Sequence, residues 1–143
     1  MQNNAIISEN PEGNIEILVR HHLEFATQDF RRWLNLLHDD AVIEFPYGES
    51  AGNAPRLEGK ATIAKAIESF LIQVPGIRFN NPVIYPGLDP DIAFATYDVE
   101  VKVYQTGRLY KQKYIGHFRQ REGKLIYLAE YYDPTKTREA FSD

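Results

Sequence analysis

Long stretches of alternating polar and apolar residues, separated by short turns, fill the second half of this 143-residue chain. They predict four strands, with turn residues between them. Glycine lies in three of these connections and proline in the first, which is the composition of tight reversals between antiparallel strands. The predicted strands span residues 77–85, 92–104, 109–120 and 124–132, and Asp133-Pro134 ends the sheet. Four consecutive strands with hairpin turns predict one antiparallel sheet.

The first half of the chain reads as helical instead. Apolar residues recur at helical spacing from Pro11, with Asn10 as a candidate cap; Asp29 opens a second helix that Asp39 and Asp40 end, and a third helix spans residues 61–73. A short strand at 41–45 and a long loop at 46–59 separate the second and third helices. Residues 1–10 are expected to form a mobile tail, and residues 11–143 a single domain. Helices followed by strands predict an α+β fold, with three N-terminal helices packed on one face of the antiparallel sheet.

The turns also predict which side chains share a face of the sheet. A two-residue turn at Thr106-Gly107 and a three-residue loop at 121–123 would place Tyr114 opposite both Val99 and Glu130. The face under the helices is then apolar and aromatic, whereas the other face is charged. The helix-facing set is Tyr97, Val99, Val101, Val103, Tyr110, Gln112, Tyr114, Gly116, Phe118, Leu128, Glu130 and Tyr132, and the charged set is Asp98, Glu100, Lys102, Lys111, Lys113 and His117.

Glu130 is the exception on the apolar face. A carboxylate among tyrosines and valines is costly unless it is hydrogen-bonded, paired or neutralised by a raised pKa. It could act as a general acid/base or substrate anchor in a cavity, or as a structural carboxylate satisfied by a tyrosine hydroxyl or a helix residue. Both interpretations stay open at this point.

Composition narrows the classes of partner. Net charge is −4 and no basic cluster is present, so a nucleic-acid partner is not expected. No apolar run approaches the roughly 20 residues of a membrane span, no secretory signal is apparent and cysteine is absent, so we expect a cytoplasmic protein without membrane contact. Aromatic residues make up 13% of the chain, which suits the wall of a pocket for a hydrophobic small molecule. No metal-ligand spacing occurs, and we expect neither a metal nor a cofactor.

Four strings carry a resemblance to a known group: LLHDDAVIEFP, RLEGKATI, QTGRLYKQKYIG and EGKLIYLAEYYDP. They resemble the nuclear transport factor 2-like superfamily, which includes ketosteroid isomerases and SnoaL-like polyketide cyclases. The resemblance implies a strongly curved sheet that forms a cone with an internal pocket. Aligned with the ketosteroid isomerases, the catalytic base falls on Phe45, the oxyanion tyrosine on His21 and the oxyanion aspartic acid on Gly116. None of the three groups is retained, so the steroid isomerase mechanism is not supported.

The chain is more similar to SnoaL-like proteins of the phenazine-biosynthesis A/B type. That resemblance implies an acid/base at Glu130, within EYYDP, and a homodimer formed through the sheet. The alignment with the ketosteroid isomerases favours His21 as the histidine in the cavity, whereas the apolar stripe of the helix favours His22; the two point about 100 degrees apart.

These expectations define a candidate site. The candidate catalytic residues are Glu130, His21 and Tyr114, and the candidate substrate-binding residues are Phe45, Tyr97, Val99, Tyr110, Gln112, Phe118, Leu128 and Tyr132. The predicted function is cofactor-free acid/base catalysis, of an isomerase, cyclase or dehydratase type, on a hydrophobic substrate. The alternatives are a binding module without turnover and a dimeric scaffold of the same fold.

Overall fold

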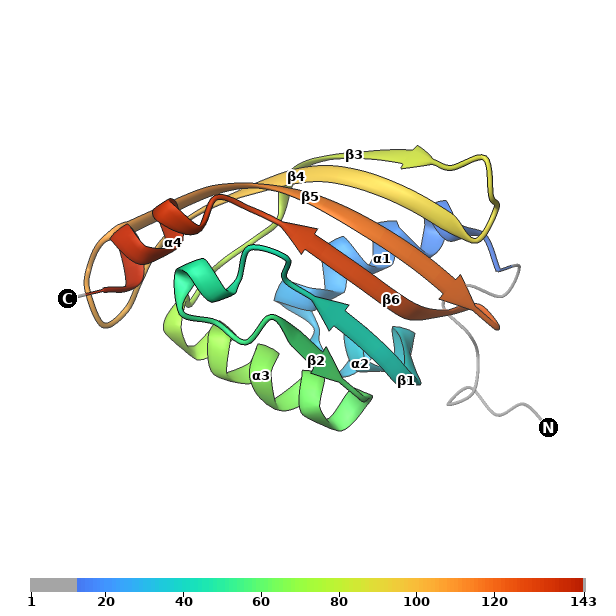
Figure 1. Cartoon of the computed structure of the whole chain (residues 1–143), viewed down its shortest axis with the longest axis horizontal. Helices are drawn as coiled ribbons and strands as arrows, with labels where there is room; N and C mark the ends of the chain where they lie inside the picture. The colour runs from blue at the N-terminus through green and yellow to red at the C-terminus, as the bar shows by residue number, and fades with distance from the viewer. Residues whose placement is uncertain (1–12, 143) are drawn as a thin grey trace.

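The computed structural model describes residues 13–142, and its centre is a six-stranded sheet that arches over three helices (Figure 1). The strands lie in the order β2-β1-β6-β5-β4-β3. Helices α1, α2 and α3 lie under the concave face, and α4 lies at the end of the sheet near the C-terminus (Figure 1). The strands are β1 Leu37–Glu44, β2 Arg56–Glu58, β3 Asn80–Pro86, β4 Ile92–Lys102, β5 Leu109–Arg121 and β6 Lys124–Tyr131, and the helices are α1 Ile15–Gln28, α2 Phe30–Leu36, α3 Lys60–Gln73 and α4 Pro134–Phe141.

The predicted α+β class and helix-on-sheet layout are confirmed, with one addition to the sheet. Strands β3 to β6 are antiparallel as expected. Strand β1 joins β6 in parallel, pairing Val42 with Tyr127, and β2 joins β1 on its outer edge. Strand β1 thus extends the antiparallel strands at the free edge of β6, and its parallel pairing makes the sheet mixed.

The predicted strand registers were each wrong by two residues. The β4–β5 connection is longer than a two-residue turn, so Tyr97, not Val99, pairs with Tyr114. The β5–β6 turn is shorter than expected: Glu122 and Gly123 both have positive φ and form a two-residue turn that pairs Arg121 with Lys124. A bulge between Arg119 and Gln120 then shifts the register by one more residue. Glu130 consequently lies opposite Gly116 rather than Tyr114.

The helix boundaries also differ from the sequence expectation. Asn14, not Asn10, caps α1, with its side chain accepting from the backbone N–H groups of Glu16 and Ile17. The predicted tail at residues 1–10 and the proposed start at Pro11 lie outside the described residues. Asp29 caps α2 as expected, but α2 ends at Leu36, so Asp39 and Asp40 belong to β1 and not to a helix end.

Two elements lie where the sequence predicted loop or chain end. The loop at 46–59 contains a short 3-10 turn, η2 (Glu49–Ala51), and β2. Asp133-Pro134 ends the sheet, as predicted, and also begins α4, with Asp133 as the cap and Pro134 in the first turn. Thr137 of α4 is thereby buried against the sheet, where it forms a hydrogen bond with Tyr110.

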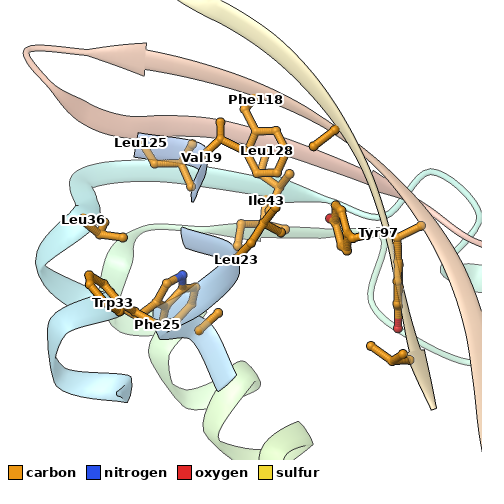
Figure 2. Close-up of a cluster of buried hydrophobic side chains, with 14 of the residues drawn as sticks. Val19, Leu23, Phe25, Trp33, Leu36, Ile43, Tyr97, Phe118, Leu125 and Leu128 are labelled. Carbon is orange, nitrogen blue, oxygen red and sulfur yellow. The ribbon is translucent and has the colours of Figure 1, made fainter. Parts of the chain in front are cut away.

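One hydrophobic core joins the concave face to the helices. Phe118, Leu125 and Leu128 from the sheet belong to one cluster with helix residues such as Val19, Leu23 and Trp33 (Figure 2). The opposite face carries the predicted charged side chains Glu100, Lys102, Lys111 and Lys113, all exposed. Phe94, Ile115 and Tyr131 are also exposed on the outer side of the sheet, at 42%, 50% and 37%. Within residues 13–142, no helix is long and apolar enough to cross a membrane.

Candidate functional site

A cavity of about 220 Å³ lies between the concave face of the sheet and the helices. Its wall is mostly apolar and aromatic, with side chains from α1, α2, α3 and α4, from β1, β2, β5 and β6, and from the loops before β2 and β3. The residues that line it are His22, Ala26, Thr27, Trp33, Ile43, Phe45, Asn53, Ala54, Leu57, Ala66, Ile67, Phe70, Leu71, Ile77, Phe79, Tyr110, Tyr114, Leu128, Glu130, Tyr132 and Thr137. Glu130 is the one carboxylate among these residues, and the set contains no lysine or arginine.

Six of the predicted site residues line this cavity. They are Glu130, Tyr114, Phe45, Tyr110, Leu128 and Tyr132. Tyr97 is outside the lining, but its hydroxyl forms a hydrogen bond with Glu130. Val99 and Phe118 are core residues outside the lining. Gln112 is also outside the lining. Its side-chain amide forms two hydrogen bonds with the backbone of Asp133: Nε2 donates to the Asp133 carbonyl at 2.8 Å, and Oε1 accepts from the Asp133 N–H at 3.1 Å.

The sequence left open whether His21 or His22 faces the cavity, and the structure places His22 there. His22 lines the cavity and is 3% exposed, whereas His21 stacks on Phe25 with 5.1 Å between ring centres. The apolar stripe of α1 decides the orientation, since Leu18, Val19 and His22 share the side that packs on the sheet. His21 is therefore outside the lining that contains Glu130, and His22 is the histidine among the lining residues.

The side chain of Glu130 forms a hydrogen bond with Tyr97. The Tyr97 hydroxyl donates to Oε2 of Glu130 at 2.6 Å, a short charge-assisted hydrogen bond. Gly116, directly across on β5, makes room for this contact. A Cβ at that position would lie 2.6 Å from Cε1 of Phe118 and 2.9 Å from the Tyr97 hydroxyl. Glycine at 116 thus leaves the space that Tyr97 needs to reach the carboxylate.

The environment of Glu130 changes its protonation. Burial raises the pKa of Glu130 from its usual 4.5 to about 7, and the Tyr97 hydrogen bond opposes that rise by stabilising the carboxylate. Glu130 is partly exposed and lines the cavity. A carboxyl group with a pKa near neutrality can both accept and return a proton at physiological pH.

Hydroxyl groups form a second polar cluster on the same wall. The Tyr110 hydroxyl lies 2.7 Å from that of Tyr114 and 3.3 Å from Oγ1 of Thr137, and Tyr132 accepts a hydrogen bond from Asn53 at 3.1 Å. Burial raises the pKa of Tyr114 well above its usual value, and that of Tyr110 and Tyr132 in the same direction. These phenols remain protonated at neutral pH and can act as hydrogen-bond donors rather than as bases.

On the helix side of the cavity, His22 of α1 forms a hydrogen bond with Trp33 of α2. The indole Nε1–H of Trp33 donates to Nδ1 of His22 at 2.9 Å. Desolvation lowers the pKa of His22 from 6.5 to about 4, so its imidazole is neutral at physiological pH.

Several lining residues were not predicted from the sequence. Thr27 and Ile77 lie near helix ends, Asn53 and Ala54 lie in the loop before β2, and Thr137 belongs to α4. Strand alternation could not identify them because none was among the alternating residues that set the two faces of the sheet. The length of the 46–59 loop was the one available signal, since long loops in compact domains often form binding sites.

A family profile described as "SnoaL-like domain" matches residues 18–128. The protein YesE of Bacillus subtilis, described as uncharacterised, is 32% identical over 114 residues, which is 80% of this chain and 77% of YesE. The PhzA/B-like protein PA3332 of Pseudomonas aeruginosa, also described as uncharacterised, is 30% identical over 125 residues, which is 87% of each chain.

Solved structures share the same architecture. A crystal structure from Bacillus subtilis, named provisionally as an isomerase, superposes with a TM-score of 0.80 at 30% identity, covering 91% of this chain and 93% of that one. The phenazine biosynthesis-related protein PhzB2 of Pseudomonas aeruginosa has a TM-score of 0.78 at 20% identity, covering 91% of this chain and 85% of its own. The match of the profile to most of the chain, together with these relatives, shows that the chain belongs to the SnoaL-like family, within the nuclear transport factor 2-like superfamily.

Proposed function

We propose that this protein is a small-molecule acid/base catalyst that uses Glu130 to move a proton on a hydrophobic, carbonyl-bearing substrate. The observation that carries the proposal is the position of Glu130: it is the one carboxylate in the described lining of an aromatic cavity, held by Tyr97 on one oxygen. The raised pKa of about 7 supports the same role, because such a group exchanges protons near neutral pH.

The proposed step needs no external reactant. The Glu130 carboxylate takes a proton from the carbon next to the carbonyl, and the electron pair of that C–H bond forms a carbon–carbon double bond. The carbonyl π pair moves to the oxygen, where hydrogen-bond donors stabilise the developing charge. Protonated Glu130 returns the proton to a different carbon of the conjugated system, so the net reaction is an isomerisation. An enolate formed in this way could instead attack a second carbonyl: its carbon forms a bond to the carbonyl carbon, the π pair of that carbonyl moves to its oxygen, and protonated Glu130 gives its proton to this oxygen, which is the cyclase variant.

The lining favours a substrate whose enclosed part carries no charge. An anionic group would find no lysine or arginine among the described lining residues, and it would meet Glu130 as a like charge. Aromatic side chains such as Phe45, Phe79 and Tyr114 favour a flat or cyclic ligand, since rings stack and pack edge to face.

The two alternatives differ in what they require of the cavity. A scaffold that needs no ligand would fill this space with side chains, so the cavity of about 220 Å³ favours a ligand-binding protein. A binding module without turnover requires Glu130 to be locked. Within the described residues, Tyr97 donates to Oε2 of Glu130, and we propose that Oε1 contacts the ligand.

Deuterium exchange on 1-tetralone tests the proposal. This bicyclic ketone has exchangeable protons beside its carbonyl, and NMR in D₂O measures their loss whatever the natural substrate is. The wild-type protein should accelerate exchange, and Glu130→Gln should reduce the acceleration at least about 100-fold. Glu68→Gln, on the exposed face of α3, is the matched control and should leave it unchanged.

The outcomes separate catalysis from binding. Exchange that survives in Glu130→Gln contradicts the role of Glu130. A wild-type protein that binds 1-tetralone without accelerating exchange supports the binding module instead.

We also propose that the protein is a cytoplasmic homodimer formed through the outer face of the sheet. The exposed apolar residues Phe94, Ile115 and Tyr131 lie beside the charged residues of that face and support an interface there. Sedimentation should give about twice the 16.5 kDa chain mass, and Ile115→Glu should shift the protein to monomer. A wild-type protein that sediments as a monomer contradicts the dimer.

A further inference from the structure

The hydrogen bond between Trp33 and His22 fixes which ring nitrogen of His22 carries the proton. An indole Nε1–H is a donor only, so Nδ1 of His22, at 2.9 Å, must present its lone pair. A neutral imidazole with an unprotonated Nδ1 has its hydrogen on Nε2. Protonation of Nδ1 would break this bond and place a charge in an apolar site, and both effects oppose it.

The Nε2–H of His22 is the polar group that this arrangement leaves for a ligand. His22 lines the cavity, and no residue within 13–142 accepts a hydrogen bond from Nε2. Phe118 lies against the ring edge to face at 5.2 Å between centres and offers no acceptor oxygen or nitrogen. A ligand that enters the cavity would remove water from this N–H group, which is costly unless the ligand supplies an acceptor.

Two further polar atoms on α1 lack a partner among the described residues, Nδ1 of His21 and Oγ1 of Thr27, and of these two residues Thr27 lines the cavity. Oγ1 of Thr27 is fully enclosed and forms no hydrogen bond in the described part of the chain, although Thr27 lines the cavity. Glu130, in contrast, comes from β6, and Tyr114 comes from β5. The helix wall and the sheet wall therefore offer different chemistry: a neutral donor on one, and a proton-accepting carboxylate on the other.

We propose that His22 is a second ligand-contacting residue, a neutral Nε2–H donor that binds a carbonyl oxygen of the substrate, with Trp33 as the positioning residue that selects this tautomer. The inference rests on the proposed function in taking a carbonyl-bearing substrate. His22 moves no proton in this role. Its N–H stabilises negative charge as it develops on the oxygen while Glu130 accepts the proton from carbon.

The tautomer is tested first, because it needs no ligand. Nitrogen-15 NMR of the histidine rings in the wild-type protein should show a pyridine-type Nδ1 and a pyrrole-type Nε2 for His22 between pH 6 and pH 8. Trp33→Phe keeps an aromatic ring but removes the donor, so the second tautomer should appear. A wild-type His22 with its proton on Nδ1, or on both nitrogens, overturns the proposal.

Two probes of nearly equal shape test the contact itself. 2-Acetylnaphthalene offers a carbonyl acceptor, and 2-isopropylnaphthalene lacks it; equilibrium dialysis gives both dissociation constants. His22→Phe should weaken the ketone relative to the hydrocarbon about tenfold, the loss expected for one hydrogen bond. His22→Gln, whose amide can donate from a similar position, should restore most of the ratio. His21→Phe, outside the lining, is the matched control and should not change it.

Failure of this proposal is distinguishable from failure of the proposed function. An unchanged affinity ratio in folded His22→Phe overturns the role of His22 even if Glu130-dependent exchange on 1-tetralone is present. A ratio that depends on His22, in a protein that catalyses no exchange, supports the His22 contact and removes the catalytic role of Glu130.

Discussion

Replacement of Glu130 by glutamine should stabilise the protein at high pH and not at low pH. Burial raises the pKa of Glu130 from 4.5 to about 7, so between these values the folded protein binds more protons than the unfolded chain does. The free energy of unfolding of the wild type must therefore fall as pH rises through this window and then level off. A difference of about 2.5 pH units corresponds to about 3 kcal/mol of stability lost between pH 4.5 and pH 8.

Glutamine cannot ionise and has nearly the shape of the protonated acid. Relative to the wild type, Glu130→Gln should gain about 3 kcal/mol between pH 4.5 and pH 8, measured by urea unfolding at several pH values. The exposed Glu68→Gln variant controls for the loss of one carboxylate, and its curve should follow that of the wild type. Wild-type and Glu130→Gln stabilities that run parallel across this range would refute the reasoning, because they would mean that Glu130 ionises without cost in the folded protein.

Three further substitutions test the support around Glu130. Tyr97→Phe removes the donor that holds the carboxylate, so the pKa of Glu130 should rise further and the 1-tetralone exchange profile should move to higher pH; a profile that stays in place contradicts the 2.6 Å bond. Gly116→Ala places a Cβ 2.6 Å from the Phe118 ring and should cost about 1–3 kcal/mol in thermal unfolding, whereas wild-type stability would mean that this ring moves freely. Asp133→Ala removes the α4 cap, in which Oδ1 accepts from the Thr135 N–H at 2.9 Å, and should cost about 1 kcal/mol; Asp133→Asn, which can still cap, should recover most of it.

The position of Glu130 on the cavity face was predictable, although both registers were wrong. Faces depend only on whether a register shift is odd or even, because strand side chains alternate with a period of two. On β6, the turn at Glu122-Gly123 and the bulge after Arg119 each shift the pairing by one residue. Their sum is an even shift of two, so Glu130 stays on the predicted face. The partner of Glu130 was not predictable, because neither the turn type nor the bulge has a clear signature in EGKLIYL.

The choice between His21 and His22 shows a second limit of the sequence. Both interpretations assumed a helix, and helix periodicity correctly placed His22 on the buried side. The resemblance to ketosteroid isomerases favoured His21. That alignment matches sequence positions, and it does not determine how α1 is rotated about its own axis. That rotation is set by packing of Leu18 and Val19 against the sheet and by the bond to Trp33, eleven residues away.

Pairings between distant segments were the least visible part of the fold. Nothing in the string DDAVIEFP indicates that β1 runs parallel to β6, since its partners are about 85 residues later. Helix α4 was missed because Asp-Pro both ends a strand and begins a helix. Its consequence for the site is direct: Thr137, on α4, completes the hydroxyl cluster with Tyr110 and Tyr114.

The most direct test of the central claim is a carbon-13 NMR titration of the Glu130 side-chain carboxyl group, assigned by comparison with Glu130→Gln. The account predicts a midpoint near pH 7, well above the 4.5 of an ordinary glutamate, because the group is enclosed in an aromatic cavity. It also predicts that the midpoint rises in Tyr97→Phe. A wild-type midpoint near 4.5 would contradict the account, since Glu130 would then be permanently ionised at neutral pH and unsuited to return a proton.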